Sequence, residues 1–548
     1  CDYYLVDSFN EMDIPFPEKG NPARYEMAAS YGEKVYSSIK RANKDAVWVM
    51  QGWMFGYQRH IWDYETLGAL VSRVPDDKML LLDLAVDYNR HFWHSEVNWE
   101  YYKGFYNKQW VYSVIPNMGG KTGMTGVLDF YANGHLEALS SSNRGNLVAH
   151  GLAPEGIENN EVLYELVTDA GWSDHRMDVR DWLKQYSINR YGKAPAQLMK
   201  AWDYLLKSVY GTFTDHPRFN WQFRPGLVKN GSINISDDYF KGLESFVAAS
   251  EELKDSPYYL TDLCEMTAHY LGGKAEILTR QIDQEYLLGD TLQAHFLQSR
   301  FETFMLGMDR ILSQHPTLRL DRWVSFASKA ARTEAQRKQY EMNARRIVTV
   351  WGPPVDDYSA RMWSGLVGSY YLGRWKEYYK GRDSGKSADL SSWERKWVEE
   401  NRVYKKWNSD FDLIDFSRKM IGLSQDISSA DLLLNRPAMI GTWSLARNSS
   451  KDLLFNIPAR MLVGLNGVSL ECLKGKGDIE VTGLVLEADG KVIYSSSDRV
   501  LSDEGILNLK LEIPANVTAN NGCVLKLKIK SSTDSAAGIV ICVNKKQS

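Results

Sequence analysis

The first part of the chain alternates continuous apolar runs with stretches of helical character. Residues 1–165 contain five apolar runs, and each ends in polar or glycine-containing residues: YYLVDSFNE (3–11), AVWVMQGW (46–53), MLLLDL (79–84), WVYSVIPNM (110–118) and NLVAHGLAPEG (146–156). A helical stretch, ARYEMAASYGEKVYSSIKRAN, separates the first two runs. Continuous apolar strands separated by helices indicate parallel β/α units. Five units do not close an eight-stranded barrel, so a barrel would need about three more strands before Cys1.

The middle of the chain has a different periodicity. From about residue 166 to 427, apolar residues recur at helical spacing, which predicts a domain made of helices. The segment RFETFMLGMDRIL places six apolar side chains on one helical face: Phe301, Phe304, Met305, Met308, Ile311 and Leu312. We interpret this stripe as core, since no cofactor-binding motif accompanies it.

Short alternating strands are predicted from residue 428 to 548. The segment LNLKLEI turns four apolar side chains to one face: Leu507, Leu509, Leu511 and Ile513. The dipeptide Asp489-Gly490 separates two strand-like runs, which is a strong signal for a β-hairpin. The three patterns together predict a multidomain protein with an α/β region over 1–165, an all-α domain over 166–427 and an all-β sandwich over 428–548.

The bulk composition narrows the classes of function. The chain has 548 residues, more than one hydrophobic core usually serves, so several domains are expected. Its net charge of -4 comes without an acidic or basic block, which argues against nucleic acid as a partner. No apolar stretch approaches the roughly 20 residues that a membrane-spanning helix needs. The aromatic fraction of 12% fits either a large core or platforms for sugars, and composition alone favours the core.

Motifs for metals, nucleotides and an activated serine are missing from the sequence. The five cysteines form no CxxC pair and no metal-ligand spacing, although Cys523 and Cys542 could pair in an oxidising compartment. The string NMGGKTG resembles a phosphate-binding loop, but that motif needs a glycine where this chain has Ile115. Neither HExxH nor GxSxG occurs. We therefore predict no metal and no other cofactor.

Two of the predicted strands end in a glutamate, Glu11 in FNEMDIP and Glu155 in APEGIENNEVLYEL. They follow the first and fifth runs, and strands four apart face each other across an eight-stranded barrel. Two opposed carboxylates about 5–5.5 Å apart suit retaining glycoside cleavage, and catalytic groups of barrels sit at the carboxyl ends of strands. Asn10 would then hydrogen-bond a sugar hydroxyl or acetamido group. A glutamate that ends a strand can equally be a solvated cap, and Pro154-Glu155-Gly156 can be a plain turn.

Longer strings favour the catalytic interpretation. The chain resembles the α-N-acetylglucosaminidases of glycoside hydrolase family 89 in the strings DSFNE, AVWVMQGWMF, MLLLDL, NMGG and APEGIENNEVLYEL, and in the later WGPPVDDYSARMWSGLVGSYYLGRWKEYY. The resemblance runs in order from Cys1 to about residue 420. It implies that residues 1–165 are the C-terminal part of a (β/α)8 TIM-type barrel whose N-terminal strands are absent from this chain. The α-helical domain would complete the active site, and the β-sandwich would be an accessory module.

The resemblance also implies an activity and a set of site residues. Members of this family release terminal α-linked N-acetylglucosamine from glycans with retention of configuration and without a metal. Carried over by motif, Glu11 matches the general acid/base and Glu155 matches the nucleophile. The implied substrate-binding positions are Asn10, Trp53, Asn117, Trp351 and Tyr358. The last two belong to the helical region and are expected to reach over the mouth of the barrel.

Three features depart from the animal members of the family. Pro116 and Met118 stand where those members have His and Phe, and the stretch between Trp351 and Tyr358 is shorter. The module after residue 428 lies outside the resemblance, so we expect a bacterial member with an added domain. Such a protein would be secreted, periplasmic or lipid-anchored at the bacterial cell surface, although no signal is visible in this chain.

The sequence leaves several alternatives open for the partner and for the function. The expected partner is a glycan with terminal α-linked N-acetylglucosamine, of heparan type or mucin type, and a homo-oligomer is left open. A catalytically inactive carbohydrate-binding protein on the same fold would share these patterns. So would a hexosaminidase of another anomeric preference. Asp83, at the end of MLLLDL, could tune the site or anchor a neighbouring loop.

Overall fold

A computed structural model describes most of the chain. The described residues are 2–121, 123–156, 158, 160–225, 233–287, 290–352, 356–400, 407, 411–428, 439–462, 465–474, 479–488, 490–497, 500–501, 506–512, 522–531 and 535–544. They divide into two compact units. The first unit comprises Cys1–Gly273, Met305–Tyr378 and Ala388–Leu423, and the second comprises Lys274–Phe304, Tyr379–Ser387 and Ser424–Ser548.

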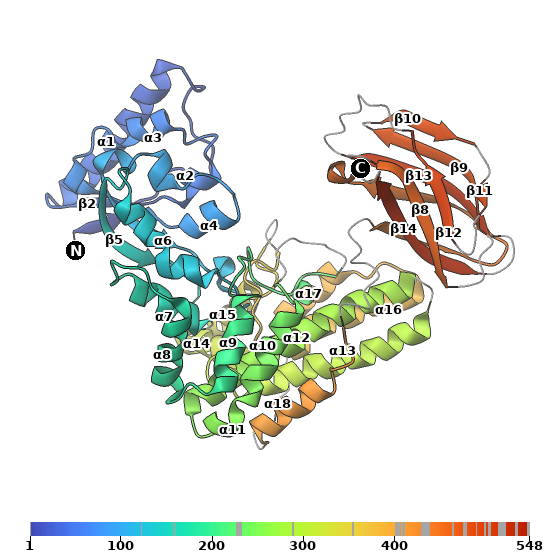
Figure 1. Ribbon diagram of the computed structural model, residues 1–548. Coiled ribbons are helices and arrows are strands. Elements are labelled where there is room, and N and C mark those ends of the chain that lie inside the picture. Colours follow the sequence, from blue (N-terminus) through green and yellow to red (C-terminus); the bar gives the residue numbers. More distant parts are fainter. Residues whose placement is uncertain are drawn as a thin grey trace. The chain divides into compact units, whose positions relative to one another are not determined.

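The first unit begins with a sheet of five parallel strands, which confirms the predicted β/α pattern (Figure 1). The strands, in their order across the sheet, are β1 (Tyr3–Leu5), β2 (Val47–Gln51), β3 (Met79–Asp83), β4 (Gln109–Val114) and β5 (Asn146–Leu152). Val49, for example, pairs with Leu5 on one side and with Leu80 on the other. Because all neighbouring pairs are parallel, the segments that follow the strands leave from the same edge of the sheet. Glu11 and Glu155 lie in two of these segments.

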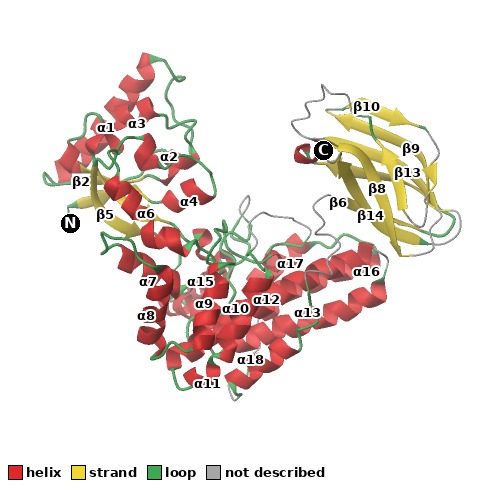
Figure 2. Ribbon diagram, in the orientation of Figure 1, coloured by secondary structure: helices red, strands yellow, loops and turns green. Residues whose placement is uncertain are grey.

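Helices and short turns connect these strands (Figure 2). They are α1 (Pro22–Ala42), α2 (Trp53–Tyr57), α3 (Tyr64–Val71), η1 (Asp76–Lys78), α4 (Val86–His91), α5 (Asn98–Tyr101), η2 (Phe105–Asn107), η3 (Met118–Gly120) and α6 (Leu128–Ser140). The predicted first helix begins at Pro22 because Asn21 Oδ1 accepts the N–H of Ala23 over 3.0 Å. Arg24 of α1 is buried and donates to Thr66 Oγ1 over 2.9 Å, which ties α1 to α3.

Helices dominate the chain from Glu161 to Gly422, as the periodicity predicts. They are α7 (Glu161–Ala170), α8 (Val179–Tyr191), α9 (Ala196–Leu206), η4 (Asn220–Gln222), α10 (Asp237–Ala248), α11 (Ser250–Leu253), α12 (Pro257–Leu287), α13 (Thr291–Leu312), α14 (Leu320–Ala330), α15 (Glu334–Ile347), η5 (Leu366–Tyr371), α16 (Leu372–Ser384), α17 (Leu390–Glu399) and α18 (Leu413–Gly422). The apolar stripe predicted on α13 is buried, because none of its six side chains is more than 1% exposed. Within the described residues, no helix combines the length and the apolar character that crossing a membrane requires.

Two antiparallel sheets make up the described residues from Met439 to Asn544. Their strands are β6 (Met439–Leu445), β7 (Ser450–Ile457), β8 (Leu465–Lys474), β9 (Ile479–Ala488), β10 (Lys491–Ser496), β11 (Val500–Leu501), β12 (Ile506–Lys510), β13 (Cys523–Ser531) and β14 (Ala536–Asn544), with α19 (Ala459–Leu462) after β7. One sheet has the order β10-β9-β13-β7, with β11 also paired to β9, and the other has the order β12-β8-β14-β6. This region therefore has the all-β character that the alternation predicts.

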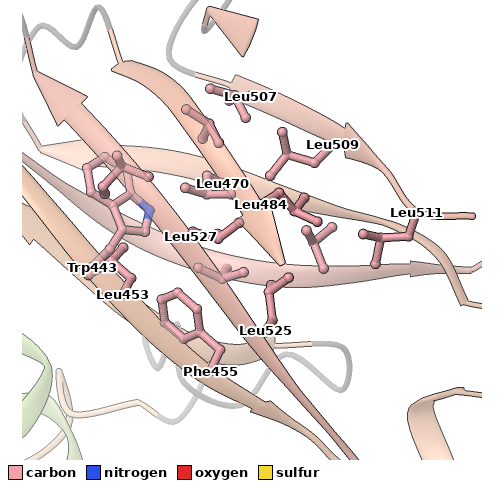
Figure 3. Packing of buried hydrophobic residues seen from close by; sticks show 14 of the residues in the cluster. Trp443, Leu453, Phe455, Leu470, Leu484, Leu507, Leu509, Leu511, Leu525 and Leu527 are labelled. Atoms are coloured by element: carbon pink, nitrogen blue, oxygen red, sulfur yellow. The ribbon is translucent and has the colours of Figure 1, made fainter. Parts of the chain in front are cut away.

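The two antiparallel sheets share one apolar core, as a β-sandwich requires (Figure 3). Three of the four side chains predicted to point inward are buried: Leu507, Leu509 and Leu511. The fourth, Ile513, lies outside the described residues. Strands β9 and β10 pair antiparallel around the predicted turn, of which Gly490 is described, with a φ of 75°. Cys542 keeps a free thiol, so the pairing with Cys523 that the sequence allows is not formed.

Candidate active site

Asn10 and Glu11 lie in a tightly turned loop that follows β1. Phe9 and Glu11 have positive φ angles of 56° and 52°. Such angles are uncommon for residues other than glycine and persist where the surroundings hold them. Glu11 is exposed, whereas the carboxamide oxygen of Asn10 is shielded and has no hydrogen-bond partner among the described residues. An acceptor in that state is suited to a hydrogen bond from a ligand.

Two donors hold the carboxylate of Glu155, which lies in the loop after β5. The Tyr358 hydroxyl donates to Glu155 Oε2 over 2.9 Å, and the backbone N–H of Gly119 donates to the same oxygen. Glu155 is nevertheless an exposed residue. A plain solvated cap would not be tied to two segments so far away in the sequence. The carboxylate therefore has a fixed orientation and remains open to a ligand.

The charges of both predicted acids, Glu11 and Glu155, act on the Tyr358 hydroxyl. Burial raises the pKa of Tyr358 above its usual value, the charge and the hydrogen bond of Glu155 raise it further, and the charge of Glu11 adds to the effect. Glu11 is therefore close enough to act electrostatically on a hydroxyl that contacts Glu155. The Trp351 ring lies 5.2 Å from the Tyr358 ring between centroids, and Trp351 is 41% exposed. The structure thus gathers three predicted site residues, Glu11, Glu155 and Trp351, around a fourth, Tyr358.

Trp53 and Asn117 have different surroundings. Trp53, at the start of α2, is half-buried against a cluster that includes Tyr88, and its ring centroid lies 5.8 Å from that of Tyr57. Asn117 is buried and donates from Nδ2 to the backbone oxygen of Gly156 over 2.9 Å. Asn117 therefore holds the segment directly after Glu155, and its contact with a substrate stays a prediction.

The two glycines of the NMGG string allow close packing at this site. Gly119 and Gly120 have φ angles of 72° and 60°, in the left-handed region. A Cβ atom at Gly119 would overlap Lys121 and the backbone of Tyr358, and one at Gly120 would overlap the guanidinium of Arg361. Glycine at both positions therefore lets the segment that carries Tyr358 approach the end of β4.

Two basic residues that the sequence analysis did not identify, Lys121, which is buried, and Arg361, which is half-buried, lie against the same phenol and glycines. Lys121 Nζ donates to the backbone oxygen of Met118 over 2.9 Å and lies 4.7 Å from the centre of the Tyr358 ring. Arg361 Nη1 donates to the backbone oxygen of Gly119 over 3.0 Å. Burial lowers the pKa of Lys121 well below its usual value and lowers that of Arg361 to about 10. The double glycine before Lys121 offered a signal in the sequence, whereas nothing marked Arg361.

His216 and Asp215 form a second pair that sequence patterns did not reveal. The His216 ring lies 5.6 Å from the Tyr358 ring between centroids, edge to face. His216 Nδ1 lies 2.5 Å from Asp215 Oδ1. Burial lowers the pKa of His216, and the bond to Asp215 opposes that effect. The pair comes from the segment between α9 and η4, and it reaches the site only through tertiary packing.

A buried ion network fixes the residue that precedes Tyr358. Arg374 Nη1 lies 2.9 Å from Asp357 Oδ1 and 3.0 Å from Glu394 Oε1. The backbone N–H of Arg224 donates to Asp357 Oδ2 over 3.0 Å, and its Nε donates to Glu394 over 3.0 Å. Arg374, Asp357 and Glu394 are each at most 1% exposed. Because buried charges are tolerated only when they are paired, this network allows Tyr358 little freedom to move.

A cleft of about 280 Å³ lies on one side of the Glu155 loop. Its lining residues are Gly120, Glu155, Gly156, Glu158, Thr317, Arg322, Trp323, Phe326, Arg361 and Trp363. Arg322 Nη1 on α14 lies 2.6 Å from Glu158 Oε1 and so joins the two walls. The cleft is therefore lined by aromatic rings and by an ion pair, and it contacts the loop that carries Glu155.

Two family models match this chain, one after the other. Residues 1–174 match the α-N-acetylglucosaminidase TIM-barrel domain, and residues 182–422 match the α-N-acetylglucosaminidase C-terminal domain. The chain belongs to the α-N-acetylglucosaminidase family. Human α-N-acetylglucosaminidase is 30% identical to it over 390 residues, which are 68% of this chain and 50% of the human protein. The chain thus spans about half the length of the curated relative that it matches.

Solved structures of an enzyme from Clostridium perfringens share the fold. A family 89 glycoside hydrolase in complex with 2-acetamido-1,2-dideoxynojirimycin has a TM-score of 0.67 at 24% identity, over 79% of this chain and 49% of that chain. A double variant, in complex with its substrate GlcNAc-α-1,4-galactose, has a TM-score of 0.66 at 24% identity, over 78% of this chain and 49% of that chain. The α-N-acetylglucosaminidase fold is therefore common to these chains.

Two of the three departures expected for this α-N-acetylglucosaminidase family member, at Pro116 and Met118, lie at described residues. Met118 lies with Trp53 against the buried cluster that includes Tyr88, and Pro116 is buried. In the shortened stretch after Trp351, residues 353–355 lie outside the described residues. Among the described residues, no group of three or more His, Cys, Asp or Glu side chains could hold a metal ion. Carboxylates and a phenol that are held in fixed positions are groups that can transfer protons or act as nucleophiles.

Proposed function

We propose that this chain forms part of a retaining glycoside hydrolase that releases terminal α-linked N-acetylglucosamine from glycans. The observation that carries the proposal is the position of the Tyr358 hydroxyl, which contacts Glu155 and is influenced by the charge of Glu11. A pair of carboxylates that share such a neighbour suits a double displacement. The family membership supports the choice of sugar, and the C. perfringens relative is described with GlcNAc-α-1,4-galactose as its substrate.

In the first step Glu11 acts as the acid and Glu155 as the nucleophile. Glu155 attacks the anomeric carbon, the bond to the leaving oxygen breaks, and that oxygen takes the proton of Glu11. The products are a glycosyl ester on Glu155 and a free alcohol. In the second step the Glu11 carboxylate removes a proton from water, the water oxygen attacks the anomeric carbon, and Glu155 leaves as a carboxylate. Two inversions give retention of configuration.

The other site residues orient these two acids and the sugar. Tyr358 and the backbone N–H of Gly119 hold one oxygen of Glu155, which leaves the other oxygen to attack. Trp351 and Trp53 present aromatic faces on which a pyranose ring stacks through its C–H groups. The shielded oxygen of Asn10 accepts a hydrogen bond from the sugar or its acetamido group.

The proposal extends to the setting of the enzyme. The five-stranded parallel sheet would be part of a (β/α)8 barrel, a proposal that the TIM-barrel description of the matching family model supports. The natural glycan would be of heparan type or mucin type. A secreted, periplasmic or surface-anchored enzyme would meet such glycans outside the cell.

The test uses aryl α-N-acetylglucosaminides with a good leaving group and the whole protein. Glu155→Ala is expected to abolish turnover and to regain part of it with azide, which yields the inverted glycosyl azide. Glu11→Ala is expected to be rescued with formation of the retained azide, because the covalent intermediate still forms. Glu18→Ala, an exposed glutamate in the same region, is the matched control and should behave as wild type.

Other outcomes would point to the alternatives. Near-wild-type activity of Glu155→Ala would overturn the assignment of the nucleophile. Binding of N-acetylglucosamine by the wild type without turnover would indicate an inactive carbohydrate-binding protein. Hydrolysis of the β-anomer alone would indicate a hexosaminidase of another anomeric preference.

A further inference from the structure

Asn160 ends the loop that carries Glu155, and three of its atoms are bonded. Its backbone has a positive φ of 56° directly before α7. The Tyr210 hydroxyl donates to Asn160 Oδ1 over 2.7 Å, and Asn160 Nδ2 donates to the backbone oxygen of Thr125 over 3.1 Å. The backbone N–H of Asn160 donates to the carboxyl group of Glu265. Asparagine adopts this conformation more readily than most residues. The bonds, and not the backbone angle alone, therefore hold Asn160 at the start of α7.

Glu265 reaches this loop from α12, in the helical part of the first unit. Its side chain is buried, and its Oε1 atom has no hydrogen-bond partner among the described residues. The charged groups that act on it are Glu161 from α7, Asp262 from its own helix and Arg190 from α8. Arg190 forms a two-point ion pair with Asp262, at 2.7 and 2.8 Å. The cation is thus engaged by Asp262, and Glu265 remains beside two other carboxyl groups.

The surroundings favour a neutral Glu265. The cavity that Glu265 shares with Glu161 and Asp262 has a volume of about 10 Å³, at the lower limit for one water molecule. Three tyrosines also line it: Tyr186, Tyr191 and Tyr210. Burial is the largest cause that raises the pKa of Glu265 well above its usual value, and the charges of Glu161 and Asp262 raise it further. A neutral carboxyl group still accepts the N–H of Asn160 through its carbonyl oxygen.

We propose that Glu265 is a positioning residue that holds Asn160 at the start of α7 and, through it, the carboxylate of Glu155. The link to catalysis rests on the proposed function, whereas the contact with Asn160 does not. If Glu265 loses its proton, it becomes a buried charge that Glu161 and Asp262 repel. The arrangement that brings Glu265 against Asn160 is then disfavoured. Asn160 is therefore held best at acidic pH and less firmly as the pH rises.

The test compares Glu265→Gln with Glu265→Ala in the whole protein. The glutamine keeps an acceptor for Asn160 and cannot ionise, whereas the alanine removes the acceptor. Glu276→Ala removes another buried glutamate of α12 that does not line this cavity, and it serves as the control. Two readouts are measured: hydrogen–deuterium exchange of residues 155–163 at pH 5 and pH 8, corrected for intrinsic rates, and the kcat and KM for an aryl α-N-acetylglucosaminide at pH 5.

We expect Glu265→Ala to raise exchange in this segment at least tenfold and to lower kcat about tenfold, with KM within twofold of wild type. Glu265→Gln should match wild type at pH 5 in both readouts and exchange at least threefold more slowly than wild type at pH 8. Glu276→Ala should leave the segment unchanged. A glutamine variant as impaired as the alanine variant, or wild-type exchange in Glu265→Ala, would overturn the proposal.

The two readouts separate the proposal from the proposed function. A wild type without activity on the aryl substrate would reject the glycosidase, and the exchange comparison would still decide the role of Glu265. If Glu265→Ala does not fold, the hydrogen–deuterium exchange of Glu265→Gln at pH 8, compared with that of wild type, tests the proposal by itself. Exchange as fast as that of wild type at pH 8 would then reject the proposed role of the proton.

Discussion

Tyr358 donates a hydrogen bond to Glu155 over 2.9 Å although 203 residues separate them in the sequence. Glu155 follows the last strand of the parallel sheet, whereas Tyr358 belongs to a loop that is held by helices. The site therefore depends on two regions of the first unit, and a change in the helical region can alter a carboxylate at the end of a strand. This relationship is the basis of the first two predictions.

Tyr358→Phe should lower kcat at least tenfold while KM changes little. The substitution keeps the ring that contacts Trp351 and Lys121 but removes the donor to Glu155. A hydrogen bond to a charged group contributes about 1.5–3 kcal/mol, and each 1.4 kcal/mol corresponds to about a tenfold effect. Steady-state kinetics on an aryl α-N-acetylglucosaminide would measure it. Tyr340→Phe on α15 is the control and should be neutral, and an equally small effect at Tyr358 would contradict this role.

Gly119→Ala should inactivate the enzyme and destabilise it more than Gly192→Ala does. Both glycines have positive φ angles, 72° and 86°, so alanine costs roughly 1–2 kcal/mol at either position. Only at Gly119 does the added Cβ atom also overlap other groups, since the space around Gly192 is open. Melting temperature and activity, measured together, separate the two contributions. Equal effects of the two substitutions would show that close packing at Gly119 is unimportant.

The strands that carry the site, and the residues at their ends, could be predicted from the sequence because they depend on local patterns. Apolar runs that end in polar residues marked the strands, and parallel pairing placed their ends at one edge. Glu11 and Glu155 follow from that reasoning. Asp83 does too, and its contacts now favour one of the two roles considered for it. It is buried and accepts a hydrogen bond from Asn98 Nδ2 over 3.0 Å, so it anchors the segment that begins α5.

Arg361 and His216 could not be predicted as part of the site from the sequence, because tertiary packing alone brings them there. His216 lies in a segment without a motif, and Arg361 lies in one of the family-like strings, in which nothing singles it out. The string NMGGKTG was noticed for its likeness to a phosphate loop, but its glycines have a different use. They admit Arg361 and the backbone of Tyr358, which no periodicity in the sequence can indicate.

Asp83→Asn should flatten the dependence of stability on pH. Burial, only partly opposed by the bond from Asn98, raises the pKa of Asp83 to about 7. Because the folded pKa lies above the unfolded value of about 4, this group favours folding most at low pH, and its contribution is lost as the pH rises through about 7. The melting temperature of Asp83→Asn, relative to that of wild type, should therefore rise between pH 4 and pH 7. Asp129→Asn, at an exposed ion pair, is the control, and a slope in Asp83→Asn as steep as in this control would contradict the assignment.

Arg374→Met should destabilise the first unit and reduce activity, because it leaves two buried carboxylates without their shared cation. Removal of one partner of a buried ion pair costs roughly 3–5 kcal/mol. Urea denaturation would measure the loss, and Arg176→Met at the exposed pair with Asp129 should change stability by less than about 1 kcal/mol.

Adding Asp357→Asn to Arg374→Met should restore part of the stability, because one unpaired charge is removed. If the double variant had a lower free energy of unfolding than Arg374→Met, removing the charge of Asp357 would not relieve the loss of the cation. Charge pairing would then not be what stabilises the network. If the double variant also regained activity, the ion network would affect catalysis by holding Asp357, and with it Tyr358, in place. Tyr358 would in turn position Glu155.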